Sequence, residues 1–208
     1  MIEKADEKKF SVILLENIQS NKATANSNSA SQEAESAKIA GLEKAMEKYN
    51  NMAPYEKAVI DIEIQNKGCK EYFRIANWLC YSTGKEIDKK RVGKWMLYGR
   101  DLVYLNCLAK DAVLKGIVSS SKVGWIPQNG AHVVCFYLDI TDKEGHKKIL
   151  KYLIDNECIP KNKDGRYKNI AFKMDMQTDN GEYGKDFKAK LNLEDFINRT
   201  TGEFKKDD

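Results

Sequence analysis

Positive charge and aromatic rings coincide between residues 67 and 125. This third of the chain holds 12 basic and 5 acidic side chains, so it carries all of the excess positive charge. It also holds all three tryptophans, and its rings are interleaved with the cations. Cations contact phosphates and ring faces stack on bases, so the mixture is typical of a nucleic-acid-binding surface. The residues predicted to form that surface, or a surface for an acidic protein partner, are Lys85, Lys89, Lys90, Arg91, Lys94, Arg100, Lys122, Tyr81 and Trp125.

A second group with possible chemistry is Asp175, Asp186 and Lys188. Two runs of alternating apolar residues predict a hairpin over 170–193, and its alternation places these three polar side chains on one face. Two carboxylates and a lysine can hold Mg²⁺ and a water molecule for phosphodiester hydrolysis. The spacing resembles the D…(D/E)-x-K signature of the restriction-type nucleases, which implies metal-dependent cleavage. The polar outer face of a hairpin explains the same residues.

Other catalytic and metal-ligating patterns are missing from the sequence. The five cysteines form no C-x-x-C pair, which excludes a zinc ribbon and indicates small buried side chains. His132 and Cys135 lie three apart on a predicted strand and should face opposite sides, so they are not expected to form a dyad. His146 follows a helix start among lysines and is expected to be exposed. We predict no cofactor and no metal site.

Length and composition favour a globular chain. With 208 residues and 42% hydrophobic residues, the chain can bury a core without disulfides or metals. No run of 18 apolar residues occurs, so no membrane span and no membrane partner are predicted. The early apolar run at 12–15 is short and follows acidic residues, unlike a signal peptide, and this predicts a cytoplasmic protein.

The pattern along the chain predicts three parts. Residues 1–18 form an amphipathic segment, expected to dock on the protein's own core, with a second copy or a partner as alternatives. Residues 19–38 are rich in Ser, Asn and Ala and are predicted to be a linker. Residues 39–208 are predicted to form a single globular domain.

The elements predicted in that domain define an α+β fold. Helical spacing predicts helices over 39–49 and 70–81 and a longer helical stretch from Asp88 to Gly116. Alternation favours a strand at 58–64, although a helix fits the same letters. A hairpin over 123–140, a helix opened by Thr141-Asp142-Lys143-Glu144, and the hairpin over 170–193 complete the series. We therefore expect a helical N-terminal half packed on a small antiparallel or mixed sheet, built from two hairpins flanking one helix.

Three functions fit these features. The leading one is a non-enzymatic accessory protein that binds nucleic acid or a nucleoprotein complex, in a chain whose Lys/Asn-rich composition suggests a phage or mobile element. The second is an inhibitor or modulator that binds a host nucleic-acid enzyme through the same basic surface. The third is the metal-dependent nuclease. Homo-oligomerisation stays open.

Overall fold

The computed structural model describes residues 10–25 and 32–206, which belong to two compact units, Glu3–Gly68 and Cys69–Asp208. The division therefore falls after residue 68, whereas the sequence placed the start of the globular domain at residue 39. Each unit is described by itself below.

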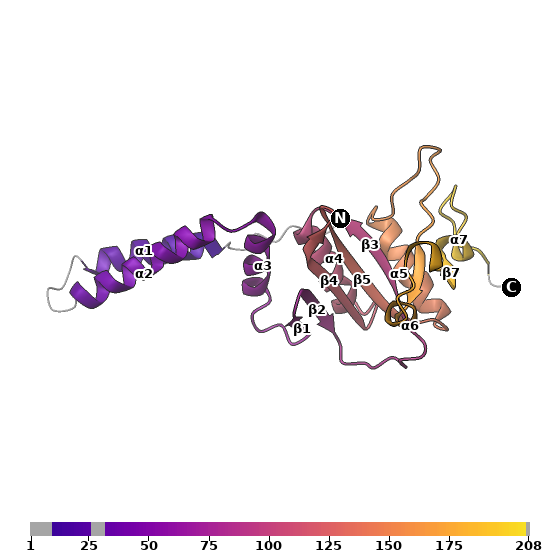
Figure 1. The fold of residues 1–208 in the computed structure, drawn as a ribbon, viewed down its shortest axis with the longest axis horizontal. Helices are drawn as coiled ribbons and strands as arrows, with labels where there is room; N and C mark the ends of the chain where they lie inside the picture. The colour runs from indigo at the N-terminus through magenta and orange to yellow at the C-terminus, as the bar shows by residue number, and fades with distance from the viewer. Residues whose placement is uncertain (1–9, 26–31, 207–208) are drawn as a thin grey trace. The chain divides into compact units, whose positions relative to one another are not determined.

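The N-terminal unit is helical (Figure 1). It contains α1 (Phe10–Ala25), α2 (Gln32–Asn50) and α3 (Pro54–Gln65). Helices α1 and α2 lie side by side, with Leu14 and Ile18 buried and Lys22 paired with Glu43 at 2.7 Å. The apolar side of the N-terminal segment is thus covered within its own chain, by helices of its own unit.

Two segments of this unit are helical where the sequence did not favour a helix. Residues 19–25 and 32–38, within the stretch predicted to be a linker, belong to α1 and α2, because alanine is the strongest helix former and needs no large apolar neighbour to be one. Residues 58–64 belong to α3, not to a strand. Pro54 occupies the first turn and the Glu56 side chain accepts a hydrogen bond from the Ala53 N–H at 2.8 Å, so the helix-start signals outweigh the alternation of isoleucines. The remaining residues of the predicted N-terminal segment and linker, 1–9 and 26–31, lie outside the described residues.

The C-terminal unit is built on one antiparallel sheet, and it confirms the α+β class. Within the described residues the sheet has seven strands in the order β1-β2-β4-β5-β3-β6-β7. The strands are β1 (Tyr72–Ile75), β2 (Trp78–Ser82), β3 (Val92–Gly99), β4 (Ser120–Gln128), β5 (Ala131–Asp139), β6 (Ala171–Met174) and β7 (Leu191–Asn192). The helices are α4 (Leu102–Leu114), α5 (Lys143–Asp155), the short α6 (Asp175–Asp179) and α7 (Leu193–Phe196), with a 3₁₀ turn, η1, at Gly184–Asp186.

The central part of the sheet has split β-α-β connectivity. The chain runs β3-α4-β4-β5-α5-β6, and the strands lie in the order β4-β5-β3-β6. This is the ferredoxin-like β-α-β-β-α-β arrangement, in which both helices cover one face of the sheet. The hairpin β1–β2 extends it beside β4. Strand β3 therefore lies between β5 and β6, far from both in sequence.

One expected helix is replaced by strands, and a second is replaced only over its first part. Residues 70–81 form the hairpin β1–β2, whose two-residue turn places Ala76 at a positive φ of 47°. The stretch from Asp88 to Gly116 is not one helix, since β3 ends at Gly99 and α4 begins after Asp101, whose carboxylate accepts a hydrogen bond from the Tyr104 N–H at 2.9 Å. These segments fit the helical and the strand periodicity equally well. Packing of their large side chains against cross-strand neighbours then decides in favour of strand.

The hairpin over 123–140 and the helix after it are confirmed. Asn129 and Gly130 both have positive φ in the turn between β4 and β5, as a two-residue hairpin turn requires. Helix α5 is capped by Asp142, whose carboxylate accepts from the Gly145 N–H at 2.9 Å, so the cap is one residue later than the expected Thr141.

The core between the sheet and α5 contains a buried histidine, contrary to the expected exposure of His146. Its Nδ1 accepts the indole N–H of Trp95 at 3.0 Å, so its Nε2 carries the proton and donates to the Ile140 carbonyl at 3.3 Å. The rings of Phe172 and Phe196 surround the imidazole. Burial lowers the pKa of His146 below its ordinary value of 6.5, because the charged imidazolium would lose its contact with water. The neutral ring also suits its partner, since Nδ1 must stay unprotonated to accept the indole N–H of Trp95.

We expect the C-terminal unit to lose stability as the pH falls below about 6.5, the ordinary histidine pKa. In that window the unfolded chain binds a proton at His146 and the folded chain does not, so the free energy of unfolding decreases by up to about 1.4 kcal/mol per pH unit. Urea titrations followed by tryptophan fluorescence report this unit, because Trp78, Trp95 and Trp125 all lie in it. The His146→Gln variant should lose most of this slope, and an equal slope in both proteins would contradict the assignment.

Candidate functional site

The two faces of the sheet differ in chemistry. The face under α4 and α5 is apolar and packs against these helices. It is also joined to α4 by a hydrogen bond, which the Tyr81 hydroxyl donates to Asn106 at 2.9 Å. Alternation sends the other side chains to the second face, which we call the lysine face. It carries Lys94 on β3, Lys122 on β4 and Lys173 on β6, together with rings from four strands. Those rings are Phe73, Trp78, Tyr98 and Tyr137.

Strand pairing sets the rows of the lysine face. One row crosses the sheet through Ser82, Ser120, Tyr137, Lys94 and Lys173. The adjacent row runs through Phe73, Cys80, Lys122, Cys135 and Met96. A third contains Ile75, Trp78, Gly124, Val133 and Tyr98. Lysines and rings of neighbouring rows therefore alternate within side-chain reach.

Lys122 is the cation at the centre of this arrangement. Its Nζ lies 4.2 Å from the centroid of the Trp78 ring and 5.3 Å from that of Tyr137. Among the described residues no carboxylate lies within ion-pair distance of it. The Trp78 ring packs over Gly124, where an added Cβ would lie 3.4 Å from it. The ammonium is thus held by ring faces and keeps its charge available to an anion.

A pocket of about 360 Å³ opens beside Lys122. Its walls come from β1, β2, β4 and β5, from the start of β3 and the loop before it, and from Asp175 at the start of α6. Phe73 is 42% exposed at the edge of this pocket, so a ring face is available there. Burial raises the pKa of the Tyr137 hydroxyl, which therefore stays protonated at the pocket wall. Aromatic walls with a few polar groups are the usual lining of a small-ligand pocket of this size.

The other two lysines fasten the segment after β6 to the sheet. Lys94 is buried, and its Nζ donates to Asp175 Oδ1 at 2.5 Å and to Thr178 Oγ1 at 3.0 Å. Lys173 donates to the Glu182 carbonyl and lies 3.5 Å from the centroid of the Tyr183 ring. Burial, and then the charge of Lys94, lower the pKa of Lys173. These contacts fix Asp175 relative to the pocket.

The predicted binding residues do not all meet. Lys94 and Lys122 lie on the lysine face, and Lys85 lines the pocket. Trp125 lies on the other side of the sheet, where the Arg74 guanidinium is 5.1 Å from the centroid of its ring. Tyr81 is fully buried, so the prediction that Tyr81 is part of a binding surface is wrong. The remaining cations are exposed outside the pocket lining: Lys89, Lys90, Arg91 and Arg100.

Sequence reasoning missed Tyr137, Lys173 and the role of Trp78. The signal for Tyr137 was present, because Val133, Cys135 and Tyr137 alternate along a strand that the sequence did predict. Lys173 and Trp78 depended on strand pairings that the sequence did not reveal.

The hairpin over 170–193 that carried the nuclease reasoning forms only in part, as the antiparallel pair β6–β7. Strand β6 ends at Met174, and only Leu191 and Asn192 pair with it in β7. Asp186 lies in the 3₁₀ turn η1, Lys188 lies outside the strands, and Asp175 pairs with Lys94 instead. In the described part of the chain no group of three or more His, Cys, Asp or Glu side chains is arranged to hold a metal ion.

The thiols next to Lys122 are not activated. Cys80 and Cys135 flank it in their row, and both are buried. Burial raises the pKa of Cys80, and it raises the pKa of Cys135 to about 11, although the Lys122 ammonium opposes the shift. All five cysteines are free. His132 and Cys135 face opposite sides of β5, as the alternation predicted, with His132 Nδ1 3.1 Å from the Gly124 carbonyl.

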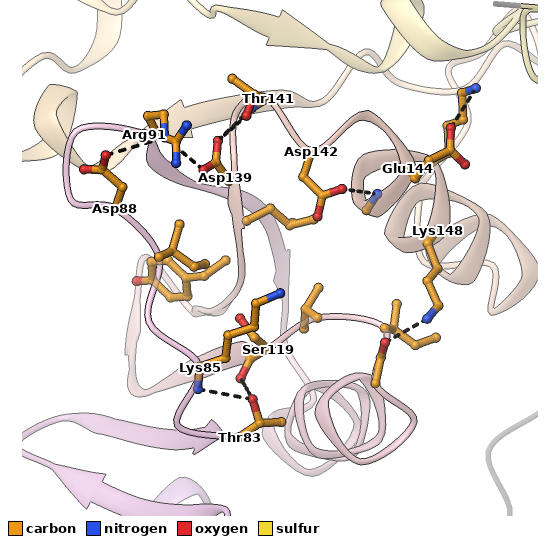
Figure 2. A pocket seen from close by; sticks show the side chains of 18 of the residues that line it. Thr83, Lys85, Asp88, Arg91, Ser119, Asp139, Thr141, Asp142, Glu144 and Lys148 are labelled. Atoms are coloured by element: carbon orange, nitrogen blue, oxygen red, sulfur yellow. Dashed lines mark hydrogen bonds and ion pairs between the residues drawn. The ribbon is translucent and has the colours of Figure 1, made fainter.

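A larger cleft of about 1040 Å³ adjoins the pocket beside Lys122 around the start of α5 (Figure 2), and the two share Lys85, Ile87 and Tyr137 as lining residues. Four of its five cations are already engaged: Arg91 pairs with Asp88 and Asp139, Lys147 with Glu144 and Lys151 with Asp155, and Lys148 donates to the Gly116 carbonyl. Five basic and five acidic side chains line it, so it presents no net charge. This balance makes it a weaker candidate for an anionic ligand than the pocket beside Lys122.

No protein-family model matches this sequence, and no curated protein matches it either. Along the described residues, no helix has both the length and the apolar character needed to cross a membrane.

Proposed function

We propose that this protein binds nucleic acid, as single strands, through the lysine face. The observation that carries the proposal is Lys122, a cation held between Trp78 and Tyr137 with no carboxylate partner among the described residues. A nucleotide is both anionic and aromatic, so its phosphate can neutralise Lys122 while its base stacks on a neighbouring ring.

A single strand suits this face better than a duplex. The rings lie on a sheet surface, and stacking on them requires bases that are not already stacked in a helix. Four-stranded sheets of the same split β-α-β type bind RNA in this way through aromatic side chains on their uncovered face. Because that fold supports many functions, the proposal rests on the side chains of the lysine face and not on the fold.

The test is the affinity of fluorescently labelled single-stranded DNA and RNA, measured by anisotropy against salt concentration. Lys122→Ala should weaken binding about tenfold at 50 mM salt, the size expected for loss of a hydrogen bond to a charged group. The slope of log affinity against log salt should become shallower by about 0.7, because one phosphate contact is lost.

The matched control is Lys115→Ala. Lys115 follows α4, on the helix-covered side of the sheet, and pairs with Asp111 at 2.9 Å. Both variants lower the net charge by one, so a general charge effect would weaken both equally and contradict the proposed site. No binding of any probe at low salt would reject nucleic-acid binding itself.

A protein partner is the second candidate. Phe73 and Ile75 are exposed on β1, which lies at the edge of the sheet next to the pocket. An edge strand with exposed apolar side chains can pair with an extended segment of another protein. In that case binding to a purified nucleic-acid enzyme should depend on Phe73 and Ile75 and should change little with salt, unlike the contacts of Lys122 with phosphate.

A further inference from the structure

We propose that the pocket beside Lys122 distinguishes bases, and that Asp175 selects a base carrying an amino group over uracil or thymine. This inference rests on the proposed function and adds a preference to it. It requires an acceptor of fixed position at the pocket wall, next to a cation and to ring faces.

Asp175 meets that requirement. It comes from α6, yet it lines the same pocket as Lys122 and Tyr137. Its side chain is 34% exposed, so a ligand can reach it. The Lys94 ammonium donates a hydrogen bond to Oδ1 of Asp175 and another to the Thr178 hydroxyl, which fixes the position of the carboxylate. Within the described residues no further hydrogen bond to this carboxylate is found, which leaves acceptor positions on Oδ2.

The chemistry of the base edges then decides what fits. A carboxylate only accepts hydrogen bonds, and it pairs well with the N4 amino group of cytosine. Thymine and uracil present the O4 acceptor at that position, and two acceptors facing one another are repelled. Adenine also carries an amino group there. The pocket volume, about 360 Å³, is suited to one nucleotide rather than to several stacked bases.

The experiment compares oligo-dC with oligo-dT of equal length, two pyrimidine strands that differ in the group facing Asp175. We expect oligo-dC to bind about tenfold more tightly to the unmodified protein. Asp175→Asn should reduce that ratio to below about twofold, because a carboxamide both donates and accepts hydrogen bonds. It keeps an oxygen for Lys94, and its melting temperature shows whether the unit stays folded.

Thr178→Ala is the matched control. It removes the other hydrogen bond of Lys94 from the same segment but leaves the carboxylate, so the preference for oligo-dC should persist. Equal affinity of the two strands for the unmodified protein would overturn base selection while leaving nucleic-acid binding intact. A preference unchanged in Asp175→Asn would overturn the role of Asp175, and no binding of either strand would overturn both proposals.

Discussion

Trp78→Ala is expected to lower single-strand affinity by between about 5-fold and 150-fold, whereas Trp125→Ala should leave it unchanged. The expected loss equals the 1–3 kcal/mol that one stacked base contributes. Trp78 lines the pocket on the lysine face and lies under the Lys122 ammonium, so the variant removes both a ring face and the support of the cation. Anisotropy titration with labelled single strands measures the change.

Trp125 is a stringent control because it is the same residue type on the other side of the same sheet. Its ring contacts the Arg74 guanidinium, and its indole N–H donates to the Ala76 carbonyl at 3.2 Å. The sequence alone favoured Trp125 as a binding residue. If Trp125→Ala weakens binding and Trp78→Ala does not, the interface is on the helix-covered side and the proposed site is wrong.

Gly93→Ala is expected to destabilise the C-terminal unit by about 3 kcal/mol, the upper part of the range for an overpacked core. A Cβ at Gly93 would lie 2.4 Å from Cε1 of Phe172 and 2.9 Å from the Lys173 carbonyl oxygen. The ring is buried against Trp95 and His146, so neither ring nor backbone can move away without disturbing the core. The melting temperature should fall by about 10 °C.

Gly99→Ala tests the same strand without the clash. Its Cβ would meet Leu105 at 3.5 Å, which is ordinary van der Waals contact. Thermal unfolding followed by tryptophan fluorescence compares the two variants directly. Equal melting temperatures for Gly93→Ala and the unmodified protein would show that the Phe172 ring is not fixed over Gly93.

The sequence correctly predicted the helix and the hairpin whose ends carry characteristic turn or capping residues. Asn129-Gly130 permits few conformations other than a tight turn, and the helix after Thr141 has both a cap and a strong apolar side. Segments with two possible periods were misassigned, since Phe73, Trp78 and Trp95 fit a helical stripe as well as alternate strand positions. Packing against strands distant in sequence decides such cases, and a local pattern does not contain that information.

The sequence predicted that the candidate site would combine cations and aromatic rings, but not which residues would share one face of the sheet. Charge and rings between 67 and 125 pointed to Lys94 and Lys122, and the structure places both on one face. The sequence did not show which rings face the same way, because that depends on the strand assignment. It also did not show that Asp175, 81 residues after Lys94, reaches the same pocket.

The central position of β3 has a consequence for how the protein is made. During synthesis β3 leaves the ribosome before either of its neighbours, since β5 follows α4 and β4, and β6 follows α5. One side of β3 therefore stays an unpaired strand edge until β6, with Phe172, has emerged. Unpaired edges can pair with strands of other chains, so the interval before β6 is available is when this part of the sheet is most exposed to misassembly.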